Sequence, residues 1–126
     1  MRTLLIAGAL LMAAGVVLGA FGAHALKGRL DPEMLAVWQT AVQYHLVHAL
    51  GMVVIAMAAL HWQNAQFAIA GWLLLAGILL FSGSLYVLAL TEVRWLGAIT
   101  PLGGVAFILG WLWLAWAASR LPGSGG

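Results

Sequence analysis

Long apolar runs dominate this chain, and one polar stretch between His24 and His48 interrupts them. Three runs, at about 3–23, 67–90 and 98–118, are each long enough to cross ~30 Å of hydrocarbon as a helix. A fourth run ends near Leu60 and follows several polar side chains, which lipid does not accommodate without partners. The pattern therefore predicts an all-α integral membrane protein with four transmembrane helices.

Turn and capping signals set the expected limits of these helices. Asp31, Pro32 and Glu33 form a helix start, with a capping side chain, a first-turn proline and an acid near the positive end of the helix dipole. Because the links are short, neighbouring helices should be antiparallel and form a bundle. We expect one domain over residues 1–121, helices at about 2–23, 32–60, 66–90 and 98–119, and a flexible tail at 122–126.

Small residues recur every seven positions in three of the runs. Membrane helices associate by close approach rather than by hydrophobic expulsion, so stripes of small residues favour packing. A seven-residue period is typical of left-handed helix crossings. The glycines expected to pack against neighbouring helices are Gly8, Gly15, Gly22, Gly77, Gly103 and Gly110.

Charge and composition exclude several classes of function. Only 6% of the 126 residues are charged, and there is no cysteine, which excludes disulfides and thiolate chemistry. The basic residues are scattered, so they are interpreted as interfacial anchors and not as a nucleic-acid surface. No complete catalytic set accompanies the serines, and we expect no enzyme activity. The basic residues are Arg2, Lys27, Arg29, Arg94 and Arg120.

The polar stretch predicts a cluster inside the bundle, near the first and third links. We expect Tyr44 and His48 to point inward, whereas His45 or Gln43 is free to face the interface or a partner. Leaving such groups in hydrocarbon costs ~1–3 kcal/mol each, which favours an inward arrangement. The predicted cluster comprises His24, Gln43, Tyr44, His48, Ser82, Ser84 and Tyr86.

Three histidines offer an alternative interpretation of the same stretch. His45 and His48 lie about 60° apart on a helix, and His24 ends the first helix on the same side of the membrane. Three imidazoles are adequate for a divalent metal, two can hold haem, and a quinone head group is a further candidate. An i,i+3 pair without an acidic neighbour is nevertheless typical of interhelical hydrogen bonding. We therefore expect no cofactor and no metal site.

Four segments resemble a known family. They are LGAFGAHAL at 18–26, WQTAVQYHLVHAL at 38–50, LFSGSLYVLAL at 80–90 and ITPLGGVAFILGW at 99–111. Together they are similar to the YgdD-like family, small multi-pass inner-membrane proteins of bacteria, of unknown function, with a relative in animal mitochondria. The matching motif residues are Gly19, Phe21, Gly22, His24, Tyr44, His48, Ser82, Gly83, Ser84, Tyr86, Thr100, Pro101, Gly103 and Gly104.

The resemblance implies a location in the bacterial inner (cytoplasmic) membrane but supplies no activity or catalytic residue. Basic C-terminal tails in the family imply cytoplasmic termini. Abundant packing devices favour a structural or accessory subunit that associates with a larger membrane complex or with itself. Histidine-based binding of haem, metal or quinone is the alternative. A small oligomeric transporter or channel is a second one, in which His48 would replace the missing mid-membrane carboxylate.

Overall fold

The computed structural model describes residues 1–123, and every regular element in that range is helical. Four continuous helices are long and apolar enough to span a membrane, which confirms the predicted fold class. Two of them contain a π-helical segment, and a 3₁₀ turn precedes the last. In chain order the elements are α1 (Arg2–Phe21), η1 (Gly22–Leu26), α2 (Pro32–Trp62), α3 (Ala65–Gly77), η2 (Ile78–Ser82), α4 (Gly83–Thr91), η3 (Arg94–Ala98) and α5 (Thr100–Ser119).

Side-chain caps fix the starts of the second and third spans. The Asp31 carboxylate accepts a hydrogen bond of 2.8 Å from the backbone N–H of Met34, and Pro32 occupies the first turn of α2. The Asn64 side chain accepts a bond of 2.9 Å from the N–H of Gln66 in the same way. These bonds satisfy backbone donors that the first helical turn leaves unpaired.

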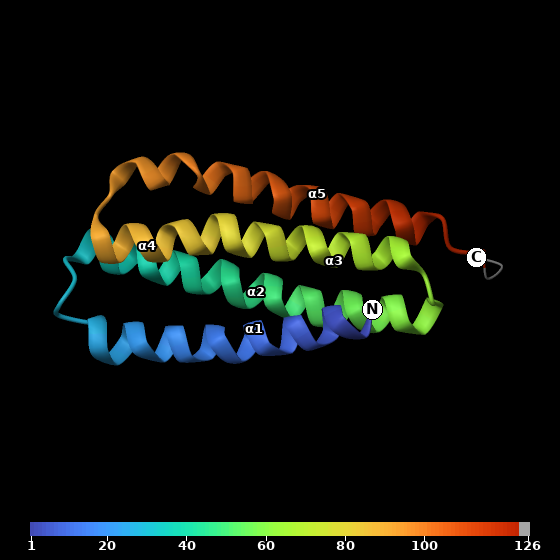
Figure 1. The fold of residues 1–126 in the computed structure, drawn as a ribbon, viewed down its shortest axis with the longest axis horizontal. Coiled ribbons are helices and arrows are strands. Elements are labelled where there is room, and N and C mark those ends of the chain that lie inside the picture. Colours follow the sequence, from blue (N-terminus) through green and yellow to red (C-terminus); the bar gives the residue numbers. More distant parts are fainter. Residues whose placement is uncertain (124–126) are drawn as a thin grey trace.

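The four spans lie side by side, with α2 and the α3–α4 span in the middle (Figure 1). The first helix packs mainly on α2, and α5 packs mainly on α3 and η2. The two flanking spans are accordingly far less buried than the two central ones. Both termini lie at one end of the molecule, and the links α1–α2 and α4–α5 lie at the other (Figure 1).

Glycines allow the flanking helices to approach the central ones closely. A Cβ at Gly8 would lie 3.0 Å from the Val53 side chain, and one at Gly15 would overlap Leu46, both in α2. On the other side, Gly77 of α3 lies under the ring of Phe107 in α5. Glycines of the first helix therefore lie against α2, and Gly77 of the third span lies against α5.

Two features of the helices differ from the sequence prediction. We expected regular α-helix throughout, but Gly22–Leu26 and Ile78–Ser82 are π-helical. The fourth span begins with the 3₁₀ turn Arg94–Ala98 before α5 proper. Within the predicted tail at 122–126, residues 122 and 123 are not helical, and residues 124–126 lie outside the described part of the chain.

Candidate functional site

His45 links three helices through both of its ring nitrogens. Its side chain is 3% exposed, Nε2 lies 2.7 Å from the carbonyl oxygen of Leu11, and Nδ1 lies 2.8 Å from the hydroxyl of Tyr86. A carbonyl oxygen only accepts, so Nε2 donates; in the neutral ring Nδ1 then accepts the proton of the Tyr86 hydroxyl. Helices α1, α2 and α4 are thereby joined by one fully bonded imidazole.

Three further hydrogen bonds of buried or half-buried side chains join the helices. The indole Nε1 of Trp38 donates to the Leu18 carbonyl at 3.0 Å, which ties α2 to α1 a second time. The Ser82 hydroxyl donates to the carbonyl of Ala41 at 2.8 Å. The hydroxyls of Ser84 and Thr100 lie 2.7 Å apart and join α4 to α5. Each span of the described structure is therefore joined to a neighbour by a polar side chain.

His48 is as deeply buried as His45 but uses only one ring nitrogen. The side chain is 6% exposed, and Nδ1 donates to the carbonyl of Tyr44 at 2.8 Å. The imidazole stacks on Phe107 of α5, with ring centroids 3.6 Å apart and planes at 14°. His48 also lines a shallow hollow of about 80 Å³ together with Gln43, Tyr44 and Val47, which we call the His48 hollow.

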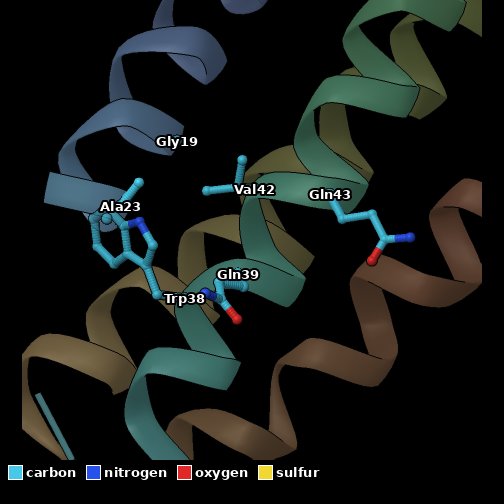
Figure 2. Close-up of a pocket in the computed structure, with 7 residues that line it drawn as sticks. Gly19, Ala23, Trp38, Gln39, Val42 and Gln43 are labelled. Atoms are coloured by element: carbon cyan, nitrogen blue, oxygen red, sulfur yellow. The ribbon is translucent and has the colours of Figure 1, made fainter. Parts of the chain in front are cut away.

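A larger groove of about 190 Å³ lies between the end of the first span and the start of the second. We call it the α1/α2 groove. Figure 2 shows Trp38 and Val42 between the two helices, and Gln43 leaving α2 on the side away from Trp38. Gln43 borders both this groove and the His48 hollow. The groove is lined by Gly19, Gly22, Ala23, Trp38, Gln39, Val42 and Gln43.

The inward position predicted for Tyr44 is wrong, because its side chain is 41% exposed. Gln43 and His24 are exposed as well, so the predicted seven-residue cluster does not assemble as one unit. The buried face of α2 is turned towards α1 and α4, and this brings His45 rather than Tyr44 into the interior. Ser82, at 0% exposure, and Ser84, at 7%, do lie inside the bundle, and Tyr86 is half-buried.

Sequence reasoning missed three members of the network. The Leu11 carbonyl is a backbone group and leaves no signal in the sequence. Trp38 was not part of the predicted polar cluster, but it is 2% exposed and donates to α1. Thr100 was not part of that cluster either, and its hydroxyl lies beside that of Ser84. The available signal for Trp38 and Thr100 was that each carries a hydrogen-bonding group on an otherwise apolar helix, where such a group needs a partner.

The three histidines do not meet. His24 belongs to η1 and points away from the bundle, and both ring nitrogens of His45 are engaged. Within residues 1–123, no group of three His, Cys, Asp or Glu side chains is placed to hold a metal ion. A three-histidine site for metal or haem is therefore not formed by this arrangement.

One ion pair lies at the end of the molecule that carries the first and third links. Arg94 donates to the Glu33 carboxylate at 3.3 Å, and both side chains are 66% exposed. An exposed pair of this kind contributes little to stability, typically ~0–1 kcal/mol. The pair joins the start of α2 to the start of the fourth span. Arg94 is thereby neutralised by an acidic side chain at the end with the first and third links.

The fold and the polar bonds define a polytopic α-helical membrane protein, and comparison with known proteins agrees. Residues 18–104 match the family described as "Protein of unknown function (DUF423)". The chain is 51% identical over 121 residues to the UPF0382 membrane protein YwdK of Bacillus subtilis, covering 95% of this chain and 98% of the relative. It is 48% identical to the UPF0382 membrane protein SERP0230 of Staphylococcus epidermidis, covering 98% and 100%.

This chain therefore belongs to the DUF423 family of membrane proteins, whose function is unknown. The names of the two relatives state no enzymatic activity. The narrower YgdD-like grouping stays a prediction. No solved structure matches the chain.

Proposed function

We propose that this protein is an accessory subunit of the membrane, which binds a transmembrane helix of another membrane protein in the α1/α2 groove. The observation that carries the proposal is the pair of exposed amides, Gln39 and Gln43, beside a groove of small residues. No hydrogen bond within residues 1–123 uses either amide as donor or acceptor.

The position of Gln43 along α2 makes its exposure informative. The 31-residue helix is about 46 Å long, which exceeds the ~30 Å hydrocarbon core, so its first turns extend into the interface. Gln43 lies more than one turn beyond Trp38, on the side of the bilayer interior. An amide without a partner in hydrocarbon is costly, whereas a hydrogen bond between membrane helices stabilises by ~0.6–2 kcal/mol. A polar partner side chain would therefore be held firmly there.

Small residues on the opposite wall of the groove favour a helix as the partner. Gly19 of α1 and Ala23 of η1 leave this wall without bulky side chains, and Trp38 and Val42 form the apolar part of the α2 wall. Close approach of backbones is the main route by which membrane helices associate. The partner we infer is a helix with a hydrogen-bonding side chain facing Gln43 and small residues facing α1.

Photo-crosslinking tests this assignment directly. Because the chain contains no cysteine, Ala23→Cys introduces a unique thiol at the rim of the groove, which a benzophenone maleimide can label while both amides stay in place. Irradiation in native membranes should give one adduct of discrete mass. The matched control is Ile108→Cys, which lies on the outer surface of α5 with 59% of its side chain exposed and should give only lipid adducts.

The mass of the adduct identifies the occupant. An adduct with a different membrane protein supports the proposal. A product of twice the chain mass would replace the proposed partner by a second copy of this chain. Lipid adducts alone at Ala23, or the same protein adducts from both positions, would refute the docking surface.

We further propose that the protein lies in the bacterial cytoplasmic membrane with both termini in the cytoplasm. The three acidic residues, Asp31, Glu33 and Glu92, are exposed at the end with the first and third links, where one of them pairs with Arg94. The other end carries Arg2, Arg120 and the amino terminus without any acid. Because Lys27 and Arg29 also lie at the link end, basic side chains alone do not set the orientation. The proposal rests on the basic C-terminal tails that the resemblance to the YgdD-like family implies.

No observation favours the transporter or channel alternative. Since the acidic residues are exposed at one end, the bundle interior of the described structure holds no carboxylate for ion or proton coupling. His48 would have to replace that carboxylate, and its Nδ1 is already bonded to the Tyr44 carbonyl in the same helix.

A further inference from the structure

His48 has a polar atom that the protein itself does not use. Its side chain is 94% buried, Nδ1 is bonded to the Tyr44 carbonyl, and no group in residues 1–123 pairs with Nε2. Every fully buried side-chain nitrogen or oxygen of the described structure has a partner. The Nε2 atom must therefore reach the surface, and the His48 hollow is where the residue opens.

The bond made by Nδ1 fixes what Nε2 can recognise. Nδ1 faces a carbonyl oxygen and must carry the proton, so in the neutral ring Nε2 has only a lone pair. A charged ring would have to be buried against Phe107 and apolar side chains, which is costly inside a membrane. The hollow consequently offers a hydrogen-bond acceptor, and its ligand must bring a donor.

Two of the four residues that line the hollow, Tyr44 and His48, carry aromatic rings. The Tyr44 ring is nearly parallel to that of His48, at 4°, and lies at 17° to that of Phe107. With 41% of its side chain exposed, Tyr44 leaves part of an aromatic surface uncovered at the hollow. Aromatic rings associate favourably with other flat rings in offset or edge-on contacts. Gln43 stands at the rim and can donate or accept a second hydrogen bond.

An apolar ridge leads away from the hollow along the outer face of α2. Its side chains follow one another at helical spacing, and each is more than half exposed. They lie on the face that the flanking helices leave open, next to Val47 of the hollow itself. The ridge consists of Val47 (54% exposed), Leu50 (52%), Val54 (59%) and Met57 (60%).

We propose that the His48 hollow binds the head group of a membrane-soluble hydroquinone, whose apolar chain lies along this ridge. One ring hydroxyl donates to His48 Nε2, the ring lies against Tyr44, and Gln43 contacts the polar edge. The oxidised quinone presents only acceptors and cannot make the bond to Nε2. The site is therefore selective for the reduced form. This inference rests on His48, and it shares only the contact to Gln43 with the proposed partner in the α1/α2 groove.

The first test uses the native full-length chain in a mild detergent and a series of small probes. Binding is followed by quenching of tryptophan fluorescence, since Trp111 lies 5.8 Å from the His48 ring. Under anaerobic conditions tetramethylhydroquinone should bind saturably. Its dimethyl ether and tetramethylbenzoquinone should bind about tenfold more weakly, as expected for the loss of one hydrogen bond. Equal binding of all three would overturn the proposal.

Two controls separate the ring from its hydroxyl and the site from the rest of the protein. Dodecanol carries a hydroxyl and a chain but no ring, and affinity equal to that of the hydroquinone would overturn the aromatic assignment. His48→Phe keeps a ring stacked on Phe107 but removes Nε2, and should erase the preference for the reduced probe. The matched variant His61→Phe changes an exposed histidine and should leave it intact. If His48→Phe does not fold, the probe series on the native chain decides.

Discussion

At the scale of single residues, His45 is the most connected side chain of the bundle. A neutral imidazole has one donor and one acceptor, and here each is matched by an oxygen from a different helix. Such a network rigidifies a membrane bundle only while every member is satisfied, because an orphaned polar atom in a dry interior is costly. His45 is thus a structural link, in contrast to His48, which keeps a free nitrogen.

The two tyrosines of the chain allow this link to be measured. Tyr86→Phe removes the hydroxyl that donates to His45 Nδ1 and leaves an unpaired acceptor in the bundle. We expect the free energy of unfolding to fall by about 1–3 kcal/mol. Equilibrium unfolding in mixed micelles, followed by circular dichroism, measures the change. Tyr44→Phe, at a half-exposed position, should cost much less, and an equal loss from both would contradict the role assigned to His45.

The same pair of neighbours shows what could be predicted at this scale. Helical periodicity places Tyr44 and His45 about 100° apart, so only one of them can point into a given contact. The choice depends on how α2 is rotated against α1, which meets His45 with Gly15 and the backbone carbonyl of Leu11. Neither feature distinguishes the two residues in the sequence. The inward position of His48 was therefore predicted correctly, whereas Tyr44 was expected in the interior position that His45 occupies.

At the scale of elements, hydropathy was sufficient to find the spans, and it could not show their π-helical turns. The existence of four transmembrane helices follows from the length of the apolar runs, which the structure confirms. A π turn widens a helix by one residue and carries no hydropathy signal. In η2 this turn holds Phe81 against α5 and Ser82 against the Ala41 carbonyl.

Adjacent glycines in α5 provide a matched test of this contact. A Cβ at Gly103 would lie 2.7 Å from the Cα atom of Phe81, so the backbone of η2 would have to move. A Cβ at Gly104 has no neighbour closer than 4.0 Å. Gly103→Ala should therefore destabilise the protein, whereas Gly104→Ala should be neutral or stabilising by up to ~1 kcal/mol through helix propensity. Thermal unfolding in detergent compares them, and a stable Gly103→Ala protein would disprove the close contact.

At the scale of the whole molecule, the bundle has a defined centre and two lightly attached sides. The spans α2 and α3–α4 form the middle, and the flanking helices bury far fewer of their residues (Figure 1). The outer face of α2 is consequently open between its neighbours, and both the α1/α2 groove and the His48 hollow lie along it. The sequence did not predict this arrangement, because it depends on which helices contact each other, and the apolar pattern of each helix does not specify its neighbours.

The proposed orientation is tested with another pair of glycines. Added side chains at Gly97 and Gly123 meet nothing within 4 Å, and the two residues belong to opposite ends of the molecule. If the termini are cytoplasmic, a membrane-impermeant maleimide should label Gly97→Cys in intact cells and Gly123→Cys only after permeabilisation. The absence of other cysteines makes the labelling specific. The reverse pattern would invert the orientation.

The hydrogen bonds between α1 and α2 have a consequence for how the chain is made. The second span is the least apolar of the four, and the first is the most apolar. Two buried donors of α2, His45 Nε2 and Trp38 Nε1, bond to carbonyls of α1. Because synthesis proceeds from the N-terminus, these acceptors are already in the bilayer when α2 leaves the ribosome.

The first two helices can therefore enter the membrane as a hairpin whose polar donors are matched before the rest of the chain exists. What α2 still lacks at that stage is a donor for His45 Nδ1, since the Ala41 carbonyl already accepts a backbone N–H within the helix. The third span brings that donor in the hydroxyl of Tyr86, and the Ser82 hydroxyl adds a second hydrogen bond to the Ala41 carbonyl. The order of the helices along the chain is thus also an order of assembly, in which each newly inserted span completes the hydrogen bonds left open by the one before.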